Sequence, residues 1–439
     1  MSNEEKKLIL LYSPLSKSGH LDSWLELVAT SLVEAGYIVS YLAENKITTN
    51  SNELDKCNFI PFEKVDHRTS IRTKFLLTEW CALGKKYAHK LPGYLPSNQS
   101  KILKKIQKYI FRQVMPCLYN LSLFIPAVNK ASSSYDFNID QFISRINAAG
   151  RLLSNKPSLV INLYLDFYSN NFSMWERLMK NYQWPWAGIR FSPDLNESPS
   201  FLSMKNFKGL WVLDETLVAD FQMKWPNKRV EYLPDFADAR LPDMGISGAV
   251  QIALERASGR KIIFLGGSIS RRKNISYWLN LLEAMKAEEW FFILVGKVWW
   301  DDLSGVDAAR LRLAQTGKEN FYMRDAYIDD EAEFNEFISV SNLIFAVYKE
   351  FPYSSNLLSK AAEFERPIVT SQKYLMGKLV EKYKIGLAVS EENHLDAVEK
   401  IKKLEEYKFE FKRFSAEYSR ENFQKAIVKM TEEIIQGEK

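Results

Sequence analysis

Three consecutive cationic side chains follow a glycine turn at the end of a predicted strand. The segment FLGGSISRRKN spans residues 264–274, and its cations are Arg271, Arg272 and Lys273. Parallel sheets bind their ligands at the carboxyl ends of their strands. Arginine grips phosphate oxygens through two parallel hydrogen bonds, and lysine places a compact charge on them. The segment therefore predicts an anion site, most simply for a diphosphate. The alternative is a solvated helix start.

Two serines follow another predicted strand. Ser354 and Ser355 precede a helix expected over residues 356–364. Their hydroxyl groups and the free amides of that helix's first turn suit a phosphate. Alternatively, one of the serines simply caps the helix. Because a departing diphosphate carries negative charge that fixed donors must meet, we interpret the two strand ends together as one phosphate site.

Candidate reactive groups also stand at strand ends in the N-terminal half. His20 begins a helix, whose dipole disfavours the charged imidazole, and it either contacts a sugar or is a surface histidine. Asp166 and Arg190 end predicted strands at 158–167 and 186–191, where they either face a ligand or have a structural role. The four histidines have no metal-ligand spacing, and neither a GxSxG elbow nor a Walker loop is present. We therefore predict neither a metal nor a cofactor.

Strands and helices alternate along the chain in two series, which favours parallel sheets. A helix is expected over residues 21–36, and a polar stretch beginning at Asp235 is interpreted as an interdomain linker. The first series has strands expected at 7–13, 37–45, 58–62, 158–167, 186–191, 209–214 and 229–236. The second series has strands expected at 261–267, 290–296, 320–325, 342–348, 366–371 and 385–389.

This organisation resembles the GT-B architecture of nucleotide-sugar glycosyltransferases, and within it the large retaining family 4. The resemblance covers nearly the whole chain and rests on the order of several short motifs. These are Gly19-His20 with Ala29, Leu32, Gly36 and Val39, then PDFAD at 234–238, Gly267 with Ile269 and Lys273, and Ala361-Ala362 with Pro367, Ile368 and Val369. The resemblance implies an α/β fold with two Rossmann-like domains whose parallel sheets face each other across a cleft. It implies domains at 1–236, 237–414 and 415–439, the last a terminal helix packing back on the first domain.

The chain departs from the family pattern at positions that matter. Family members carry two glutamates eight positions apart, and the corresponding residues here are Pro352 and Lys360. An arginine that commonly follows the first glycine is Ser268 here, so Arg271 or Arg272 is expected to replace it. Glu350 and Glu363 are the nearby acids that could substitute for the glutamate pair.

From these observations and the resemblance we assign expected roles. His20, Asp166 and Glu350 are the catalytic candidates, and Lys17 and Arg190 are assigned to the acceptor side. The donor-binding set is Gly19, Gly267, Arg271, Arg272, Lys273, Gly296, Tyr327, Ile328, Ser354, Ser355, Asn356 and Leu357. The expected activity is retaining, metal-independent transfer of a hexose-type sugar from a UDP- or GDP-linked donor to a glycan or lipid-linked acceptor, in bacterial surface polysaccharide assembly. The alternatives are a non-catalytic nucleotide-sugar-binding or partner protein, and a sugar-nucleotide epimerase of similar architecture.

The net charge of +5 conceals a basic insertion at residues 64–130, which holds 13 Lys and Arg against Asp66 and Glu79. Within it, residues 101–116 place an apolar stripe beside Lys104, Lys105 and Lys108. That pattern suits an interfacial helix on an anionic membrane, or an ordinary amphipathic helix with a solvated face. Nucleic acid is not expected as a partner, because no binding motif accompanies the charge.

The chain begins with a predicted strand rather than a signal peptide, and it contains no apolar run of the roughly 20 residues that a spanning helix needs. Its three cysteines, Cys57, Cys81 and Cys117, are too sparse for a disulfide framework and favour a reducing compartment. A cytoplasmic protein is expected, peripheral on the inner membrane face if the basic helix binds lipid.

Overall fold

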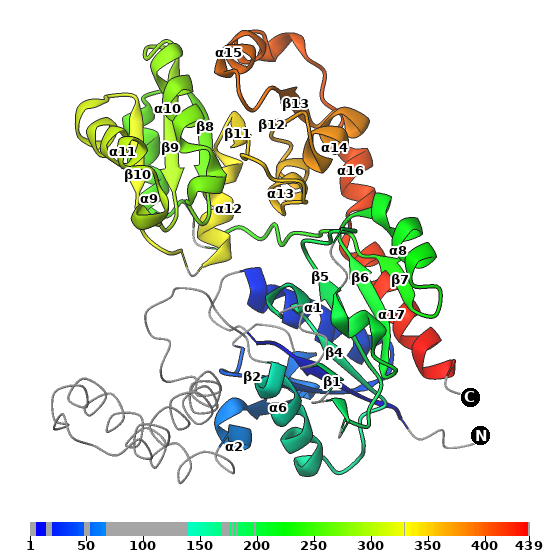
Figure 1. Cartoon of the computed structure of the whole chain (residues 1–439). Helices are drawn as coiled ribbons and strands as arrows, with labels where there is room; N and C mark the ends of the chain where they lie inside the picture. The colour runs from blue at the N-terminus through cyan, green and yellow to red at the C-terminus, as the bar shows by residue number, and fades with distance from the viewer. Residues whose placement is uncertain are drawn as a thin grey trace, which may run out of the picture.

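The computed structural model describes residues 6–14, 20–47, 53–66, 139–168, 175–176, 179–180, 182–196, 199–243, 245–328 and 330–437. The described chain forms two lobes, each built on a parallel sheet, with an extended segment running between them (Figure 1). This is the expected α/β architecture with two Rossmann-like sheets. The basic insertion and its 101–116 helix fall almost wholly outside the described residues, as do Lys17 and Gly19.

The first sheet has the strand order β3-β2-β1-β4-β5-β6-β7, and its described pairings are all parallel. Its strands are β1 (Leu8–Tyr12), β2 (Ile38–Ala43), β3 (Asn58–Pro61), β4 (Leu159–Asn162), β5 (Trp186–Arg190), β6 (Phe207–Val212) and β7 (Arg229–Tyr232). Its helices are α1 (His20–Glu34), α2 (Phe62–Asp66), α6 (Ile139–Leu152) and α8 (Val218–Lys224). Short 3-10 turns lie at η1 (Leu54–Lys56), η5 (Leu165–Phe167), η6 (Ser200–Ser203) and η7 (Glu215–Leu217).

The second sheet has the order β10-β9-β8-β11-β12-β13, again with parallel pairing. Its strands are β8 (Lys261–Gly266), β9 (Trp290–Val295), β10 (Phe321–Arg324), β11 (Leu343–Ala346), β12 (Ile368–Ser371) and β13 (Gly386–Val389). Its helices are α9 (Gly248–Ala257), α10 (Ile275–Ala284), α11 (Gly305–Gly317), α12 (Glu331–Ser339), α13 (Leu357–Glu363), α14 (Leu375–Tyr383) and α15 (His394–Lys402). Short 3-10 turns lie at η8 (Arg271–Lys273), η9 (Trp300–Asp302) and η10 (Leu404–Glu406).

Both faces of the second sheet are covered, so its strands are continuously apolar rather than alternating. The strand β9 reads WFFILV and is buried along its whole length. Side chains from α10, α11 and α15 pack on one face of the sheet. Side chains from α9, α12, α13, α14 and α16 (Phe411–Glu417) pack on the other.

The final helix α17 (Arg420–Gln436) returns to the first lobe. Its Ile427, Met430 and Ile434 are buried in the core of the first sheet, and Ala426 O accepts a 3.2 Å hydrogen bond from the Trp211 indole. Figure 1 shows this helix in red beside β6 and β7. We keep 1–236, 237–414 and 415–439 as the proposed domain boundaries.

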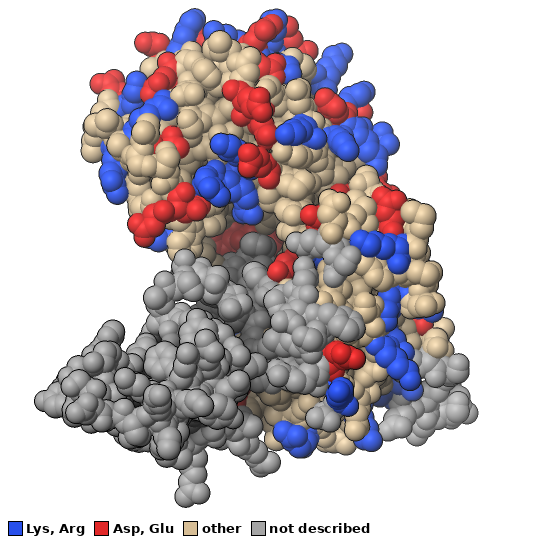
Figure 2. Space-filling view, viewed as in Figure 1, with Lys and Arg blue, Asp and Glu red and all other residues tan. Residues whose placement is uncertain are grey.

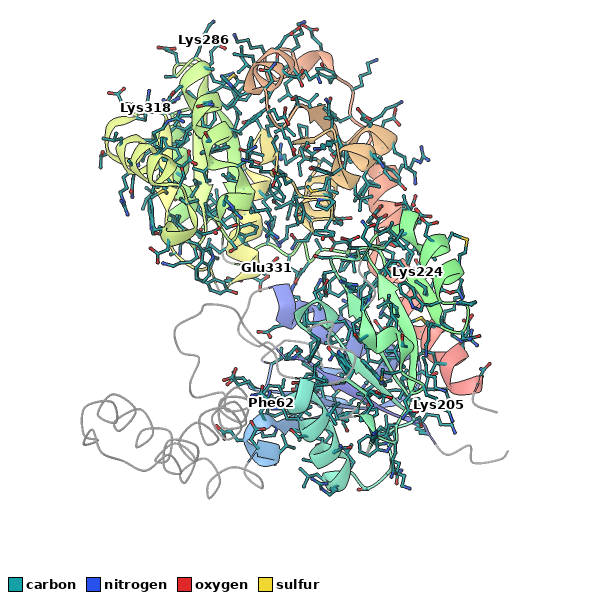
Figure 3. The ribbon with its side chains drawn as sticks, in the orientation of Figure 1. Phe62, Lys205, Lys224, Lys286, Lys318 and Glu331 are labelled. Carbon is teal, nitrogen blue, oxygen red and sulfur yellow. The ribbon has the colours of Figure 1, made fainter. Side chains whose placement is uncertain are left out.

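The strands of both sheets run toward the junction between the lobes. In Figure 3, Lys286 and Lys318, which precede β9 and β10, lie at the far end of the upper lobe, whereas Glu331, which follows β10, lies at the junction. In the lower lobe, Lys205 precedes β6 and lies at the bottom, whereas Lys224 follows β6 and lies nearer the upper lobe. Because each sheet is parallel, the carboxyl edges of both sheets face the junction.

The structure shortens several expected strands. The segment expected at 158–167 is a strand only to Asn162, because the side chain of Asn162 accepts the Tyr164 amide and turns the chain into η5. The expected strand at 229–236 ends at Tyr232, where the linker begins. No helix in the described part of the chain is long and apolar enough to cross a bilayer.

Candidate functional site

The predicted cations lie at the point where the second sheet reverses its strand order. The strands β8 and β11 are neighbours in space, and β8 is followed by Gly267 and the cationic turn η8. Such a switch point opens a crevice outside the carboxyl ends of the strands. The two loops contact each other directly, since Arg272 O accepts a 2.9 Å hydrogen bond from the Lys349 amide.

Lys273 is the buried member of the cationic turn, with only 5% of its surface exposed. Its ammonium donates a 2.5 Å hydrogen bond to the hydroxyl of Tyr348, which follows β11. Burial lowers the pKa of Lys273, the phenol opposes that shift, and the neighbouring Arg272 charge lowers the pKa further. No carboxylate among the described residues makes an ion pair with Lys273. A buried ammonium with one neutral hydrogen-bond partner among the described residues makes Lys273 a candidate for binding an anion.

Two glycines let the loops after β8 and β9 approach each other. Gly267 has a φ of +97°, and a Cβ there would lie 3.7 Å from the Lys273 ammonium. Gly296 has a φ of +137°, and a Cβ there would lie 1.9 Å from Gly267 O. Side chains at either position would oppose the left-handed backbone, and at Gly296 they would also clash with the facing chain. These two predicted glycines therefore lie in the loops of the candidate anion site, with Gly267 beside the Lys273 ammonium.

Arg271 and Arg272 are exposed at the same edge. The guanidinium of Arg272 stacks over the Phe351 ring at 4.8 Å from its centroid. The backbone amide of Arg271 donates to the carboxylate of Asp302 at 2.8 Å, which ties the cationic turn to η9. Figure 2 shows a hollow between the lobes, with both basic and acidic side chains along the lower rim of the upper lobe.

The predicted serines lie beside the linker. Ser354 donates a 3.0 Å hydrogen bond to the side chain of Asp235, and Ser359 donates to the backbone carbonyl of the same residue. Asp235 is buried, and burial raises its pKa to about 7 against the opposing effect of the Ser354 bond. Ser355 is 3.5 Å from the Leu357 amide, so it is a weak cap of α13. The strand-end serine therefore links the anion site to the linker.

Lys360, which the family resemblance aligned with a glutamate, is completely buried. Its ammonium pairs with Glu331 and with the Asn335 side chain on α12, and lies 3.5 Å from Asp238 O in the linker. Burial lowers the pKa of Lys360, and Glu331 opposes that shift. This lysine therefore fastens α12, α13 and the linker together.

The remaining candidates in the second lobe have different environments. Glu350 is exposed with a φ of +49°, and Glu363 is exposed at the far end of α13. Tyr327 is 47% exposed beyond β10, and Ile328 packs partly against the core. Asn356 is the residue before α13, and Leu357 is buried at its start.

In the first lobe, Asp166 and Arg190 are brought together. The two carboxylate oxygens of Asp166 accept the amides of Phe191 at 2.8 Å and Ser192 at 2.7 Å, and one lies 3.9 Å from Arg190 Nε. Burial raises the pKa of Asp166, whereas these amide bonds and Arg190 oppose the shift. Asp166 therefore fixes the loop after β5. His20 is the first residue of α1, and its side chain is outside the described part of the structure.

Three residues at this junction were missed by the sequence analysis. Tyr348 holds Lys273, Asp235 holds Ser354, and Trp299 lies exposed beyond β9 with its indole donating to Ser268 at 2.7 Å. Asp235 lay at the start of the predicted linker, Tyr348 ends one predicted strand and Trp299 follows another. Position at a strand end was therefore the signal that could have identified them. Among the described residues, no cluster of three or more His, Cys, Asp or Glu could hold a metal ion.

No family model matches the chain, and no curated protein matches it. Solved structures do match across 98% of this chain. An E. coli structure described as trehalose-6-phosphate bound with UDP-2-fluoro glucose has a TM-score of 0.58 at 11% identity, with 99% of that chain covered and 98% of this one. A sucrose-phosphate synthase from Thermosynechococcus elongatus has a TM-score of 0.53 at 12% identity, with 94% of that chain and 98% of this one covered. A glycosyltransferase from Rickettsia africae has a TM-score of 0.52 at 11% identity, with 94% of that chain and 98% of this one covered. At these identities the likeness shows the fold, and it confirms the expected GT-B architecture.

Proposed function

We propose that this protein is a glycosyltransferase that takes its sugar from a nucleoside-diphosphate donor bound in the second lobe. Several structures that share its fold are named as glycosyltransferases or sugar-phosphate synthases, and one is bound with a UDP-sugar analogue. The fold alone does not carry the proposal, because one fold hosts many functions. The proposal rests on the site.

The observation that carries it is the buried ammonium of Lys273 at the β8–β11 switch point, without a carboxylate partner among the described residues. A buried lysine normally pairs with an acid, since an isolated buried charge is costly. A diphosphate is an anion of the right chemistry to complete the site, with exposed Arg271 and Arg272 at its rim.

In the proposed reaction the bond between the sugar's anomeric carbon and the diphosphate oxygen breaks, the acceptor hydroxyl oxygen bonds that carbon, and the hydroxyl proton passes to the departing diphosphate. Lys273 and the arginines stabilise the negative charge that develops on the departing diphosphate. We propose that the acceptor, a glycan or a lipid-linked saccharide of bacterial surface polysaccharide, approaches from the first lobe, where Lys17 and Arg190 were assigned to the acceptor side. Retention of anomeric configuration and hexose-type transfer follow from the family resemblance.

A non-catalytic nucleotide-sugar-binding protein is the second candidate, and Lys360 favours it. Where family members have a glutamate, this chain has a lysine tied to Glu331 and buried away from solvent. A lysine committed in this way offers no carboxylate to the donor sugar. Glu350 would have to supply the missing carboxylate if the protein is catalytic.

The test is a panel of UDP- and GDP-sugars, assayed by calorimetry for binding and by nucleotide release for turnover. We expect binding of at least one donor and release of its nucleoside diphosphate. Lys273→Met, which keeps the aliphatic stem, should weaken binding by about 1.5–3 kcal/mol, the range for hydrogen bonds to charged groups. Lys286→Met is the matched control, since Lys286 lies at the far end of the lobe (Figure 3). Binding without turnover supports the second candidate, and unchanged affinity in folded Lys273→Met contradicts both.

A further inference from the structure

Two exposed aromatic side chains stand beyond adjacent strand ends beside the anion site. Trp299 follows β9 and is 50% exposed, and Tyr327 follows β10 and is 47% exposed. Among the described residues, Tyr407 is the other strongly exposed aromatic side chain, at 41%. Large aromatic surface is costly to leave in water, so its concentration at one edge of the sheet indicates a binding role.

Trp299 is held rigidly. Its indole N–H donates to Ser268 Oγ at 2.7 Å, and its backbone amide donates to Ile269 O at 2.9 Å. The following Trp300 is fixed in turn, because its indole donates to Asp325 Oδ2 at 2.7 Å. Asp325 also accepts the Val298 amide at 2.9 Å. The loops after β8, β9 and β10 are thus joined, and the Trp299 ring is oriented before any ligand arrives.

The Trp299 ring is linked to the candidate anion site through two consecutive residues, Ser268 and Gly267. Ser268, which holds the indole, directly follows Gly267, over which the Lys273 ammonium lies. A diphosphate at Lys273 has two ends, and a group carried on the end that faces Ser268 would lie toward the ends of β9 and β10. In a nucleoside diphosphate that group is a ribose with a flat heteroaromatic base.

We propose that Trp299 is the stacking platform for the nucleobase of the donor, with Ser268 as the residue that positions the indole. This inference rests on the proposed function and adds the part of the ligand that the platform recognises. An aromatic face tolerates any base, because every base has a π-face. A preorganised ring also loses little conformational freedom on binding. The platform therefore contributes affinity for nucleotides over simple phosphates.

The experiment compares UDP and GDP with inorganic pyrophosphate, using calorimetry on the full chain. Trp299→Ala should weaken nucleotide binding by about 5- to 150-fold, which corresponds to about 1–3 kcal/mol for loss of base stacking, and should leave pyrophosphate affinity unchanged. Trp299→Phe should retain most of the nucleotide affinity. Ser268→Ala should weaken nucleotide binding by a smaller factor, again without affecting pyrophosphate. Tyr407→Ala is the matched control, and it should change neither.

Each outcome bears on one proposal or both. Equal nucleotide affinity in the wild type and in folded Trp299→Ala would overturn the platform while leaving the Lys273 site intact. A parallel loss of nucleotide and pyrophosphate binding would also overturn it, since Trp299 would then only shape the anion site. A wild type that binds pyrophosphate as tightly as UDP and GDP would show that no base is recognised. A wild type that binds none of the three would overturn the proposed function and the platform with it.

Discussion

The hydroxyl of Ser354 donates a 3.0 Å hydrogen bond to the carboxyl group of Asp235, which joins the loop after β11 to the linker between the lobes. Asp235 O also accepts a hydrogen bond from Ser359 on α13. The loop that carries the candidate phosphate-binding serines is therefore fastened to the segment between the lobes. Ser354 must exchange this partner if it is to bind a phosphate.

This relationship predicts a pH-dependent stability. Burial raises the pKa of Asp235 from 3.8 to about 7, so the folded protein holds a proton that the unfolded chain releases at lower pH. The stabilisation of the neutral carboxyl group is complete below the unfolded pKa and is lost as pH rises through about 7. Asp235→Asn should therefore flatten the decline in unfolding free energy between about pH 5 and about pH 8, by about 3 kcal/mol at most.

Urea unfolding of the wild type and Asp235→Asn at both pH values measures the effect. Asp301→Asn is the matched control, because Asp301 is exposed on η9. Parallel pH profiles for the wild type and Asp235→Asn would contradict the assignment.

Nucleotide affinity should fall at alkaline pH. Burial and Arg272 lower the pKa of Lys273 below its usual 10.5, so its ammonium loses its proton at a lower pH than a surface lysine would. A bound diphosphate favours the charged form, and binding should therefore take up protons as pH approaches that lowered pKa. Calorimetry in buffers of different ionisation enthalpy, from about pH 7 to about pH 10, measures this uptake.

Lys273→Arg is the control for this prediction, since a guanidinium stays charged throughout that range. Its nucleotide affinity should lose the alkaline decline. An identical decline in folded Lys273→Arg would assign the titration to another group.

Placing at position 360 the glutamate that the family resemblance implies should destabilise the protein. Lys360→Glu would place a carboxylate beside Glu331 in a buried site, and breaking a buried pair costs about 3–5 kcal/mol. The double variant Lys360→Glu with Glu331→Lys should recover part of the loss. Chemical denaturation measures both, and Lys403→Glu, from the exposed pair with Glu399, should have little effect. A stable Lys360→Glu would show that this site tolerates an unpaired acid.

The basic insertion should bind anionic membranes. We expect the protein to co-sediment with liposomes that contain anionic lipid and not with neutral ones, because the 64–130 insertion carries 13 cations against two acids. Binding should weaken with salt, since the Debye length falls from about 10 Å at about 0.1 M to about 3 Å at about 1 M. A lipid-linked acceptor would be concentrated at such a surface.

Replacing Lys104, Lys105 and Lys108 with Glu should abolish this binding. A charge-matched control replaces Lys205, Lys286 and Lys318 with Glu. These lysines lie on the two lobes and outside residues 64–130. Equal sedimentation of both triple variants would leave residues 101–116 as a solvated helix face and favour a soluble acceptor.

Local sequence determined the elements and most of the strand ends. The run WFFILV is apolar throughout, was predicted as a strand and is a buried strand, and the cations at 271–273 follow β8 as their glycine turn indicated. These features depend on near neighbours along the chain, so pattern and turn chemistry suffice to predict them. The GT-B architecture followed from the order of such elements, with two βα series separated by one linker.

Tertiary structure alone decided which side chains meet. Lys273 and Tyr348 are 75 residues apart in sequence, and Ser354 and Asp235 are 119 apart. Hydrophobic periodicity and motif spacing therefore could not predict either contact. Burial was equally hidden: Lys360 resembles a surface lysine in sequence, yet the fold removes it from water and pairs it with Glu331. The charge state and hydrogen bonding of a polar group depend on the residues that pack around it. In a parallel sheet those residues come from distant parts of the chain, because parallel strands are joined by long crossover connections.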